Sequence, residues 1–386
     1  MAIIAEETCQ PCIVSKAEEM TVRRKKGKLL RHGYTTGACA AAAARAATMA
    51  LLWQKIVEQV EIDLPHSGKA NFRVEKCVFN SLVASCSIIK DAGDDPDVTN
   101  GAEICATVSW KTEPGIAIDG GEGVGLVTKP GLEISVGLPA INPVPRQIIT
   151  SSVREVVAGS KVNGRGIQVT ISVPQGNNLA KRTLNPRLGI KGGLSILGTT
   201  GIVIPYSVDA YTASISQALD VAVACGCRDV VLTTGRRSEK FAQSELTSLA
   251  EECFIQSGDF VGYSLQECAK RGVTRVVIWG MVGKISKLAA GHLYTNVSDS
   301  RVNIDFLAGM AASCGVPEER VKALREAVTA NQFRRMLSTA YTKQFCDRLC
   351  LLAAKKCREY AGRKLEVECI MTDYEGTILG RANVSK

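Results

Sequence analysis

The feature that most constrains the fold of this chain is an alanine run near its start. From Ala38 to Ala47 the sequence reads A-C-A-A-A-A-A-R-A-A, and alanine has the highest helix propensity of all residues. A helix with such small side chains can lie very close to a neighbouring element. The run therefore predicts a tightly packed core helix.

A turn of two glycines and two threonines comes directly before this helix. Gly33 and Gly37 allow close approach of the backbone, while Thr35 and Thr36 can accept hydrogen bonds from the free amides that open a helix. Such amides also attract anions. Two interpretations are about equal for Tyr34, Thr35, Thr36 and Gly37: a helix cap, or a turn that holds an anionic substrate.

Composition narrows the class of protein. The chain has 386 residues, 46% of them hydrophobic, which predicts two domains or one large one. Its net charge of +9 suggests an anionic partner. Nucleic acid is not expected, because the basic residues are scattered apart from Arg23–Lys28, where no stacking aromatics are interleaved. A membrane span is not expected either, since Arg45 breaks the longest apolar run.

The cysteines favour a reducing compartment. The chain has 15 of them and no secretory signal, so we expect a cytoplasmic protein in which Cys225, Cys314 and Cys350 act as small buried hydrophobes. Cys9 and Cys12 form a lone C-x-x-C without a second pair at zinc spacing, and no metal site is expected. The sequence leaves a homo-oligomer open.

The patterning changes along the chain and predicts three regions. Residues 1–28 read as a flexible tail. Residues 29–185 alternate short β-branched runs with glycine- and proline-rich turns, which is typical of a β-rich α+β domain. Residues 186–386 alternate apolar strands with long helices and end in more helices and a hairpin. This last pattern predicts a Rossmann-like α/β domain with a parallel sheet.

Ligands of such sheets bind beyond the carboxyl ends of the strands. We expect strands at Gly193–Leu197, Asp229–Thr233 and Arg275–Trp279, so the three following loops should converge. Loop amides could bind the carboxylate of a cofactor, and arginine forks could pair with carboxylates of a substrate. The other interpretation of these loops is a tight strand-to-helix connection. The candidates for cofactor binding are Gly198, Thr199, Thr200, Gly201, Gly235, Gly280 and Gly283, and those for substrate binding are Arg236, Arg237 and Lys284.

Several segments, spread from about Leu30 to Gly291, resemble the CbiD family, the cobalt-precorrin-5B C1-methyltransferases of anaerobic cobalamin synthesis. The segments are similar to the family in their order along the chain as well as in their letters. They are L-R-H-G-Y-T-T-G-A-C, D-A-G-D-D-P-D-V-T-N-G, G-G-E-G-V-G-L-V-T-K-P-G, L-P-A-I-N-P-V-P-R, L-S-I-L-G-T-T-G-I-V-I-P, T-G-R-R-S-E-K-F-A and G-M-V-G-K-I-S-K-L-A-A-G.

The resemblance implies transfer of a methyl group from S-adenosyl-L-methionine to C1 of cobalt-precorrin-5B, giving cobalt-precorrin-6A. A sulfonium methyl is already activated, so the protein mainly positions the reactants, which can contribute roughly 7–11 kcal/mol. A cobalt corrinoid rich in carboxylates would also suit the positive charge. Asp91 and Asp94, in the densest acidic cluster of the chain, are the candidates for acid–base catalysis.

Two positions depart from the family pattern. Ile204 stands where the family usually has an acidic residue, and Asn296 stands where a histidine commonly follows a threonine. The alternative function is therefore a non-catalytic corrinoid- or nucleotide-binding protein. A small-molecule kinase is a third hypothesis, against which stands the lack of a G-x-x-x-x-G-K-[ST] run.

Overall fold

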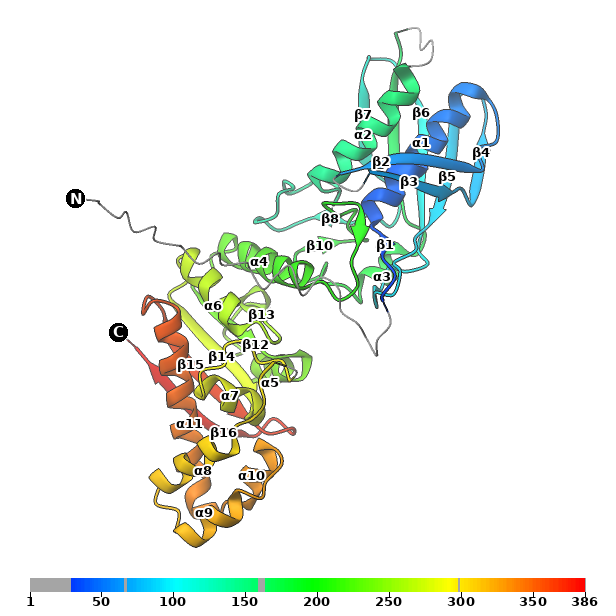
Figure 1. Cartoon of the computed structure of the whole chain (residues 1–386). Helices are drawn as coiled ribbons and strands as arrows, with labels where there is room; N and C mark the ends of the chain where they lie inside the picture. The colour runs from blue at the N-terminus through cyan, green and yellow to red at the C-terminus, as the bar shows by residue number, and fades with distance from the viewer. Residues whose placement is uncertain (1–28, 66–67, 159–163, 298, 386) are drawn as a thin grey trace, which may run out of the picture. The chain divides into compact units, whose positions relative to one another are not determined.

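The computed structural model describes residues 29–65, 68–158, 164–297 and 299–385, and these form two compact units (Figure 1). Cys9 and Cys12 lie outside the described residues. The chain passes between the units several times, so the single division expected near residue 185 is wrong. Unit 1 contains Met1–Gly125 as far as described, Pro139–Thr183 and Gly192–Ser207; unit 2 contains Leu126–Leu138, Leu184–Lys191 and Val208–Lys386.

The alanine run forms the central helix of unit 1, as predicted. Helix α1 (Thr36–Trp53) has Thr35 at its N-cap, and the Thr35 side chain accepts a hydrogen bond from the amide of Ala38. The alanines of α1 are fully buried, and α1 lies directly against α2 (Pro143–Ala158) and the sheet of the unit (Figure 1). Small side chains permit this close contact on nearly every side of the helix.

Unit 1 holds a mostly antiparallel sheet of five strands in the order β4-β5-β6-β9-β7. Only the β7–β9 pair is parallel. In β6, every second residue from Ile104 to Val108 is buried, so one face of the sheet meets α1. The strands are β4 (Lys76–Phe79), β5 (Val83–Ile89), β6 (Glu103–Lys111), β7 (Ile116–Gly120) and β9 (Gly166–Ser172), and β2 (Gln59–Leu64) and β3 (Gly68–Arg73) form a separate hairpin.

Short elements complete unit 1 and the segments that cross to unit 2. Strand β1 (Gly33–Tyr34) pairs antiparallel with β11 (Ile202–Val203) inside unit 1. Strand β8 (Leu126–Val127) pairs antiparallel with β10 (Ile190–Lys191) inside unit 2. A short helix, α3 (Gly176–Ala180), follows β9.

Unit 2 is built on a largely parallel sheet in the order β13-β12-β14-β15-β16. The first four strands are parallel, and β16 closes the edge antiparallel to β15. The apolar runs of β12 and β14 are buried on both faces, as strands between two helical layers must be. The strands are β12 (Asp229–Thr233), β13 (Phe254–Gln256), β14 (Arg275–Met281), β15 (Glu366–Thr372) and β16 (Ile378–Val384).

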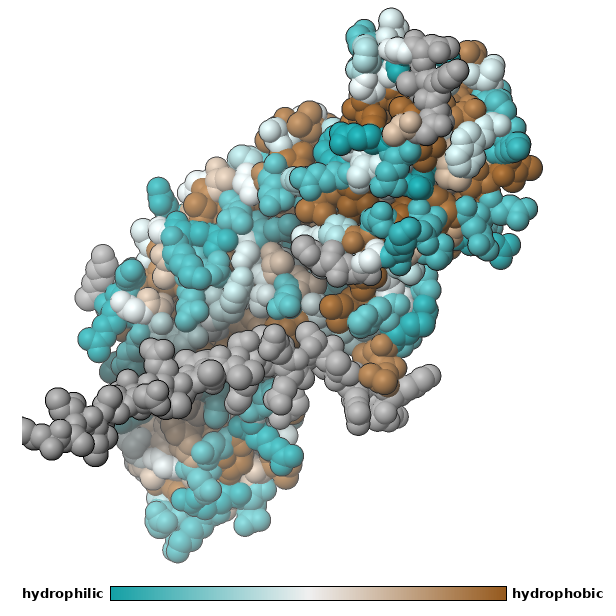
Figure 2. Space-filling view, turned by 45° about the horizontal axis from the view of Figure 1, so that its top comes forward, coloured by the Kyte–Doolittle hydropathy of each residue, from teal (hydrophilic) through white to brown (hydrophobic). Residues whose placement is uncertain are grey.

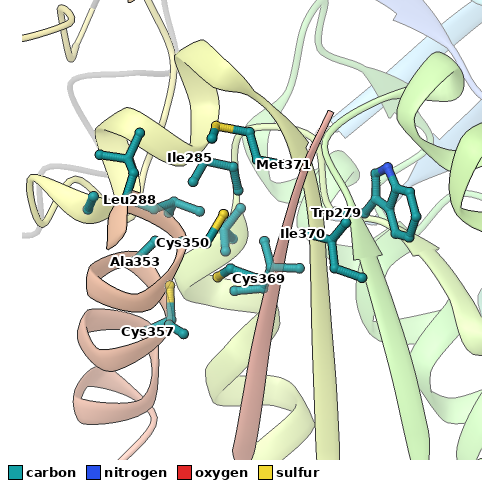
Figure 3. Packing of buried hydrophobic residues seen from close by; sticks show 14 of the residues in the cluster. Trp279, Ile285, Leu288, Cys350, Ala353, Cys357, Cys369, Ile370 and Met371 are labelled. Carbon is teal, nitrogen blue, oxygen red and sulfur yellow. The ribbon is translucent and has the colours of Figure 1, made fainter. Parts of the chain in front are cut away.

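The helices of unit 2 cover this sheet unequally. Helix α11 (Thr339–Tyr360) contacts α6 (Val261–Lys270) and α7 (Val282–Ala289), whereas α5 (Arg236–Glu245) contacts the strands β12, β13 and β14. Figure 3 shows Cys369 and Met371 on the side of α11, and Trp279 and Ile370 on the opposite side of the strands. The remaining helices are α4 (Val208–Ala224), the 3₁₀ turn η2 (Glu251–Cys253), α8 (Ile304–Ser313), α9 (Glu318–Leu324) and α10 (Ala330–Met336).

Two expectations about local structure are wrong. Leu194 and Ile196 are not part of the parallel sheet; each forms an isolated bridge within unit 1, where both are buried. A short apolar run can bury its side chains in a core when only two isolated β-bridges hold it, without forming a full strand. Cys225 is exposed, because it follows the last residue of α4, whereas Cys314 and Cys350 are buried as expected.

The surface of the described residues is mixed in character. Figure 2 shows teal and brown side chains interspersed, with the largest brown areas on the part of the picture that holds unit 1, at the upper right. Among the described helices, none combines the length and the apolar character that a membrane crossing requires.

Candidate functional site

Three segments of unit 1 meet at the start of α1, although they lie far apart in the sequence. The amide of Tyr34 donates to the carbonyl of Asp91 at 2.7 Å, and that of Thr35 donates to Gly201 at 2.9 Å. The amide of Gly37 donates to Leu197 at 3.0 Å. The G-Y-T-T-G turn, the aspartate-rich loop and the G-T-T-G loop therefore form one cluster, called here the unit 1 loop cluster.

Two glycines permit the backbones of this cluster to cross. A Cβ atom on Gly33 would lie 2.0 Å from the carbonyl carbon of Ala92. A Cβ atom on Gly198 would lie 2.5 Å from the side chain of Thr35, and Gly198 has a φ of +129°. These glycines act in packing and leave no room at these points for a ligand.

The first amides of α1 already have partners within the protein. Ala38 donates to the Thr35 hydroxyl, and Gly37 donates to the carbonyl of Leu197. The Thr36 hydroxyl accepts from the amide of Leu197 at 2.9 Å and lies 3.1 Å from the carbonyl oxygen of Ser195. The structure therefore favours the cap interpretation for Thr35, Thr36 and Gly37. Substrate binding by these residues, and by Tyr34, stays a prediction.

The two candidate acid–base residues both contact Arg31. The Arg31 guanidinium donates to both carboxylate oxygens of Asp91, and the Arg31 amide donates to Asp94 at 2.7 Å. A hydrogen bond from Arg31 and another from the amide of Gly93 lower the pKa of Asp91, although this carboxylate is exposed. A lowered pKa makes a carboxylate a weaker base. These contacts give Asp91 and Asp94 a structural role in holding Arg31. Their catalytic role stays a prediction.

The other two carboxylates of the acidic cluster also have hydrogen-bond partners in the protein. Asp95 accepts from the amide of Tyr206 at 2.8 Å, and Asp97 accepts from the buried amine of Lys90 at 2.7 Å. Among the residues that the structure describes, no group of three or more His, Cys, Asp or Glu side chains could hold a metal ion.

The expected convergence of three loops on one sheet edge is wrong. Gly198, Thr199, Thr200 and Gly201 belong to unit 1, where the next strand, β11, pairs with β1. The Thr200 hydroxyl accepts from the amide of Ile202 within the same loop. A G-T-T-G sequence forms a tight turn here because it joins two bridging segments. It does not follow a strand of the parallel sheet.

The other two loops do lie at the carboxyl edge of the parallel sheet. From β12 the chain goes to β13 on one side and then crosses to β14 on the other, so β12 and β14 are neighbours at a switch in strand order. Ligands of open α/β sheets bind at such a point. Gly235 lies just after β12, Gly280 is the second-last residue of β14 and Gly283 is the second residue of α7. A Cβ atom on Gly235 or Gly283 would meet no atom of the described residues within 4 Å.

Arg236 and Arg237 begin α5 at the same edge. Both are exposed, and neither forms an ion pair with any other described residue. The Arg237 guanidinium carbon lies 6.0 Å from the centre of the Tyr374 ring, which belongs to the turn between β15 and β16. The two arginines are therefore available to a carboxylate ligand.

Lys284 has protein partners instead. Its amine donates to the Asp259 carboxylate and, at 3.0 Å, to the carbonyl of Thr295. Lys287 donates to the same carbonyl at 2.9 Å, and burial, followed by the charge of Lys284, lowers the pKa of Lys287. These contacts join α7 to the loops after β13 and before α8. Substrate binding by Lys284 stays a prediction. The neighbouring Asn296 donates to the Tyr294 hydroxyl at 3.3 Å.

Sequence reasoning missed two buried polar atoms close to this edge. Trp279 Nε1 and Thr372 Oγ1 are both buried without a hydrogen-bond partner among the described residues. They stand near the carboxyl ends of the adjacent strands β14 and β15. The position of Thr372 and Asp373, polar residues at the end of an apolar strand, was the available signal in the sequence.

Comparison with known proteins identifies the family. The chain matches the family profiles described as CbiD over residues 23–205 and as CbiD, C-terminal domain, over residues 294–383. It is 48% identical to a cobalt-precorrin-5B C(1)-methyltransferase of Geobacillus kaustophilus over 92% of this chain and 95% of that protein. It is 45% identical to the protein of that name from Priestia megaterium over 93% and 97% of the two chains.

A solved structure is also similar. It is a crystal structure of a cobalamin biosynthesis protein, cbiD, from Archaeoglobus fulgidus, with 27% identity, a TM-score of 0.40, and coverage of 72% of this chain and 87% of that chain. The assignment rests on the sequence matches, which extend over nearly the whole length of both partners. The chain belongs to the CbiD family.

Proposed function

We propose that the chain methylates C1 of cobalt-precorrin-5B in cobalamin biosynthesis and binds S-adenosyl-L-methionine at the carboxyl edge of unit 2. The activity is that of the relatives to which 92% of the chain is 48% identical. The cofactor would lie where the Rossmann-like sheet switches strand order, between the ends of β12 and β14.

The observation that carries this location is the open space at Gly235 and Gly283. A tight connection usually needs glycine because a side chain would clash, yet no atom of the described residues lies near the Cβ positions here. The buried Trp279 Nε1 and Thr372 Oγ1, near the same edge, have no hydrogen-bond partner in the part of the chain that the structure describes. Buried polar groups without partners are rare in folded proteins. These residues therefore fit a polar cofactor in contact with the backbone.

The chemistry asks little of the side chains. When bound, S-adenosyl-L-methionine supplies an already activated methyl group, so no nucleophilic side chain is needed. Arg236 and Arg237 would pair with carboxylates of the corrinoid and hold C1 in line, and positioning of this kind can contribute roughly 7–11 kcal/mol. Gly235, Gly280 and Gly283 would let the backbone approach the cofactor.

Substitution of Gly235 by valine tests the location. Because the Cβ position is open, Gly235→Val should fold normally but occupy space that the cofactor needs. We expect it to weaken the binding of S-adenosylhomocysteine, the unreactive product, by roughly tenfold or more, which corresponds to about 1.4 kcal/mol. Titration calorimetry gives the affinity.

Gly309→Val is the matched control, because Gly309 in α8 also has an open Cβ position and lies outside the proposed site. It should bind S-adenosylhomocysteine as the wild type does. Unchanged affinity in Gly235→Val would place the cofactor elsewhere.

Two finer expectations also stay predictions. One is a cytoplasmic location, supported by the free thiols of the described cysteines. The other is assembly into a homo-oligomer, which sedimentation of the full chain would test.

A further inference from the structure

A small notch lies between the carboxyl ends of β14 and β15 and the first residues of α7. Its walls include Met281, Gly283, Asn331, Thr372, Asp373 and Tyr374. The enclosed part measures about 10 Å³, which suits a single water-sized group. The notch can therefore take one polar group of a ligand whose remainder lies outside it.

Thr372 gives this notch an unsatisfied hydroxyl. The residue is fully buried, and its Oγ1 atom has no partner among the described residues. Burying a hydroxyl without a hydrogen bond is unfavourable. A ligand group that enters the notch and bonds to Thr372 would remove this penalty, so the hydroxyl favours a polar ligand over an empty notch.

Helix α7 presents amides on one side of the notch. Met281 stands at its N-cap and has no side-chain oxygen to accept from the amides that follow it. The helix has eight residues, and the amides of Gly283 and Lys284 belong to its first turn. Amides at a helix N-terminus attract a carboxylate.

Asp373 presents a carboxylate, whose negative charge is opposite to the partial positive charge of the α7 amides. Its Oδ1 atom accepts from the amides of Glu375 at 3.0 Å and Thr377 at 2.8 Å, which fixes the carboxylate in place. Oδ2 takes no part in these two bonds. A fixed carboxylate favours a cation or a hydrogen-bond donor beside it. The notch thus offers amides for a negative group and a carboxylate for a positive one.

We infer that this notch binds the ammonium group of the α-amino acid end of S-adenosyl-L-methionine, at Asp373 and Thr372 Oγ1, while the carboxylate of the same end lies at the edge of the notch against the α7 amides. The inference rests on the proposed function, because it specifies one end of the proposed cofactor site. An α-amino acid headgroup carries its two charges on groups bonded to the same carbon atom, so the ammonium can enter the notch while the carboxylate meets the amides at its edge.

Thr372→Val tests this inference, because valine keeps the shape of threonine and removes only the hydroxyl. The probes are S-adenosylhomocysteine, which has the headgroup, and 5′-methylthioadenosine, which lacks it. We expect Thr372→Val to weaken S-adenosylhomocysteine binding roughly tenfold, as loss of a hydrogen bond to a charged group does. Binding of 5′-methylthioadenosine should not change.

Two further variants make the result specific. Thr372→Ser restores the hydroxyl and should restore affinity for S-adenosylhomocysteine. Thr212→Val removes a hydroxyl that α4 satisfies internally through Val208 and Asp209, and it should leave both affinities unchanged. Because Thr372 Oγ1 has no partner among the residues that the structure describes, Thr372→Val should melt at or above the wild-type temperature.

The outcomes separate the inference from the proposed function. Equal weakening of both probes by Thr372→Val, or no weakening of either, would overturn the headgroup assignment and leave the cofactor site in place. A change only in the KM for the corrinoid would assign the notch to a substrate carboxylate and would also overturn it. A wild-type protein that binds neither probe would contradict both proposals.

Discussion

At the scale of single residues, the clearest electrostatic feature is the pair of Lys90 and Asp97 in unit 1. The Lys90 side chain is 1% exposed, and its amine donates to Asp97 at 2.7 Å. Burial alone would raise the pKa of Asp97, but the charge of Lys90 and hydrogen bonds from Lys90 and Thr99 outweigh it, so the pKa is lowered. The pair anchors the aspartate-rich loop to the end of β5.

We predict that Lys90→Met destabilises the protein by about 3 kcal/mol, because it leaves the Asp97 carboxylate without its partner charge. Methionine preserves most of the apolar stem. The lowered pKa of Asp97 means that the pair stabilises fully above the unfolded pKa of about 4 and loses its effect as the pH falls below that value. Urea unfolding of the wild type and of Lys90→Met, at pH 7 and in acid, measures the difference in their free energies of unfolding.

The double variant Lys90→Met/Asp97→Asn is the control. It removes both charges and should recover part of the loss. The difference in the free energy of unfolding between wild type and Lys90→Met should shrink in acid. If it stayed constant, the charge pair would not be its cause.

Sequence alone could not predict which polar residues are buried. Lys90 lies next to four aspartates, in a segment that reads as a solvated loop. Trp279 and Thr372 belong to two separate apolar runs, β14 and β15, whose letters do not show whether an indole N–H or a hydroxyl finds a partner. Such facts depend on neighbours that are distant in sequence, which explains why the candidate site was only partly predicted.

At the scale of elements, the packing of the unit 1 loop cluster depends on the absence of a side chain at Gly33. The obstacle to a Cβ atom there is the backbone of Ala92 and Gly93, at 2.0 to 2.5 Å, and a backbone cannot move aside as a flexible side chain can. Strand β1 and the aspartate-rich loop must separate if any side chain is added.

We predict that Gly33→Ala destabilises unit 1 by about 3 kcal/mol, at the upper end of overpacking effects. The matched control, Gly309→Ala, adds the same atom in the middle of α8, where no atom of another described element lies within 4 Å. It should stabilise the protein by up to about 1 kcal/mol. Thermal unfolding of both variants distinguishes them, and equal effects of the two would refute this account of Gly33.

Most elements with a strong pattern were predictable. The alanine helix, β12 and β14 lie where the sequence predicts them, and unit 2 has the expected long helices and final hairpin. Strand β13 was missed because it has three residues, too few for a period. Strand β3 was missed because G-K-A-N-F-R contains no β-branched residue and pairs only within a hairpin.

At the scale of the whole molecule, the two units are interleaved in sequence. Leu184–Lys191 leaves unit 1 and joins unit 2, where the Arg187 guanidinium pairs with the buried carboxylate of Glu239 on α5. Lys129, on the other crossing segment, pairs with Glu252 at 2.6 Å. These pairs join residues far apart in the sequence. A composition change near residue 185 suggested one boundary, and only contacts over such distances show the return of Gly192–Ser207 to unit 1.

Family membership and the open carboxyl edge of unit 2 lead to one activity for the whole chain. The same protein must bind the methyl donor, bind a carboxylate-rich corrinoid, and exclude water from the methyl group during transfer. The alternative, a binding protein without turnover, shares the first two properties and lacks the third. Turnover is therefore the property to measure.

The most direct measurement is anaerobic incubation of the full chain with cobalt-precorrin-5B and S-adenosyl-L-methionine carrying a deuterated methyl group, followed by mass spectrometry of the corrinoid. The account predicts a corrinoid with the labelled methyl group at C1, formed in proportion to S-adenosylhomocysteine. A corrinoid that binds but stays unmethylated would contradict it, and would make Ile204 and Asn296 the first positions to restore.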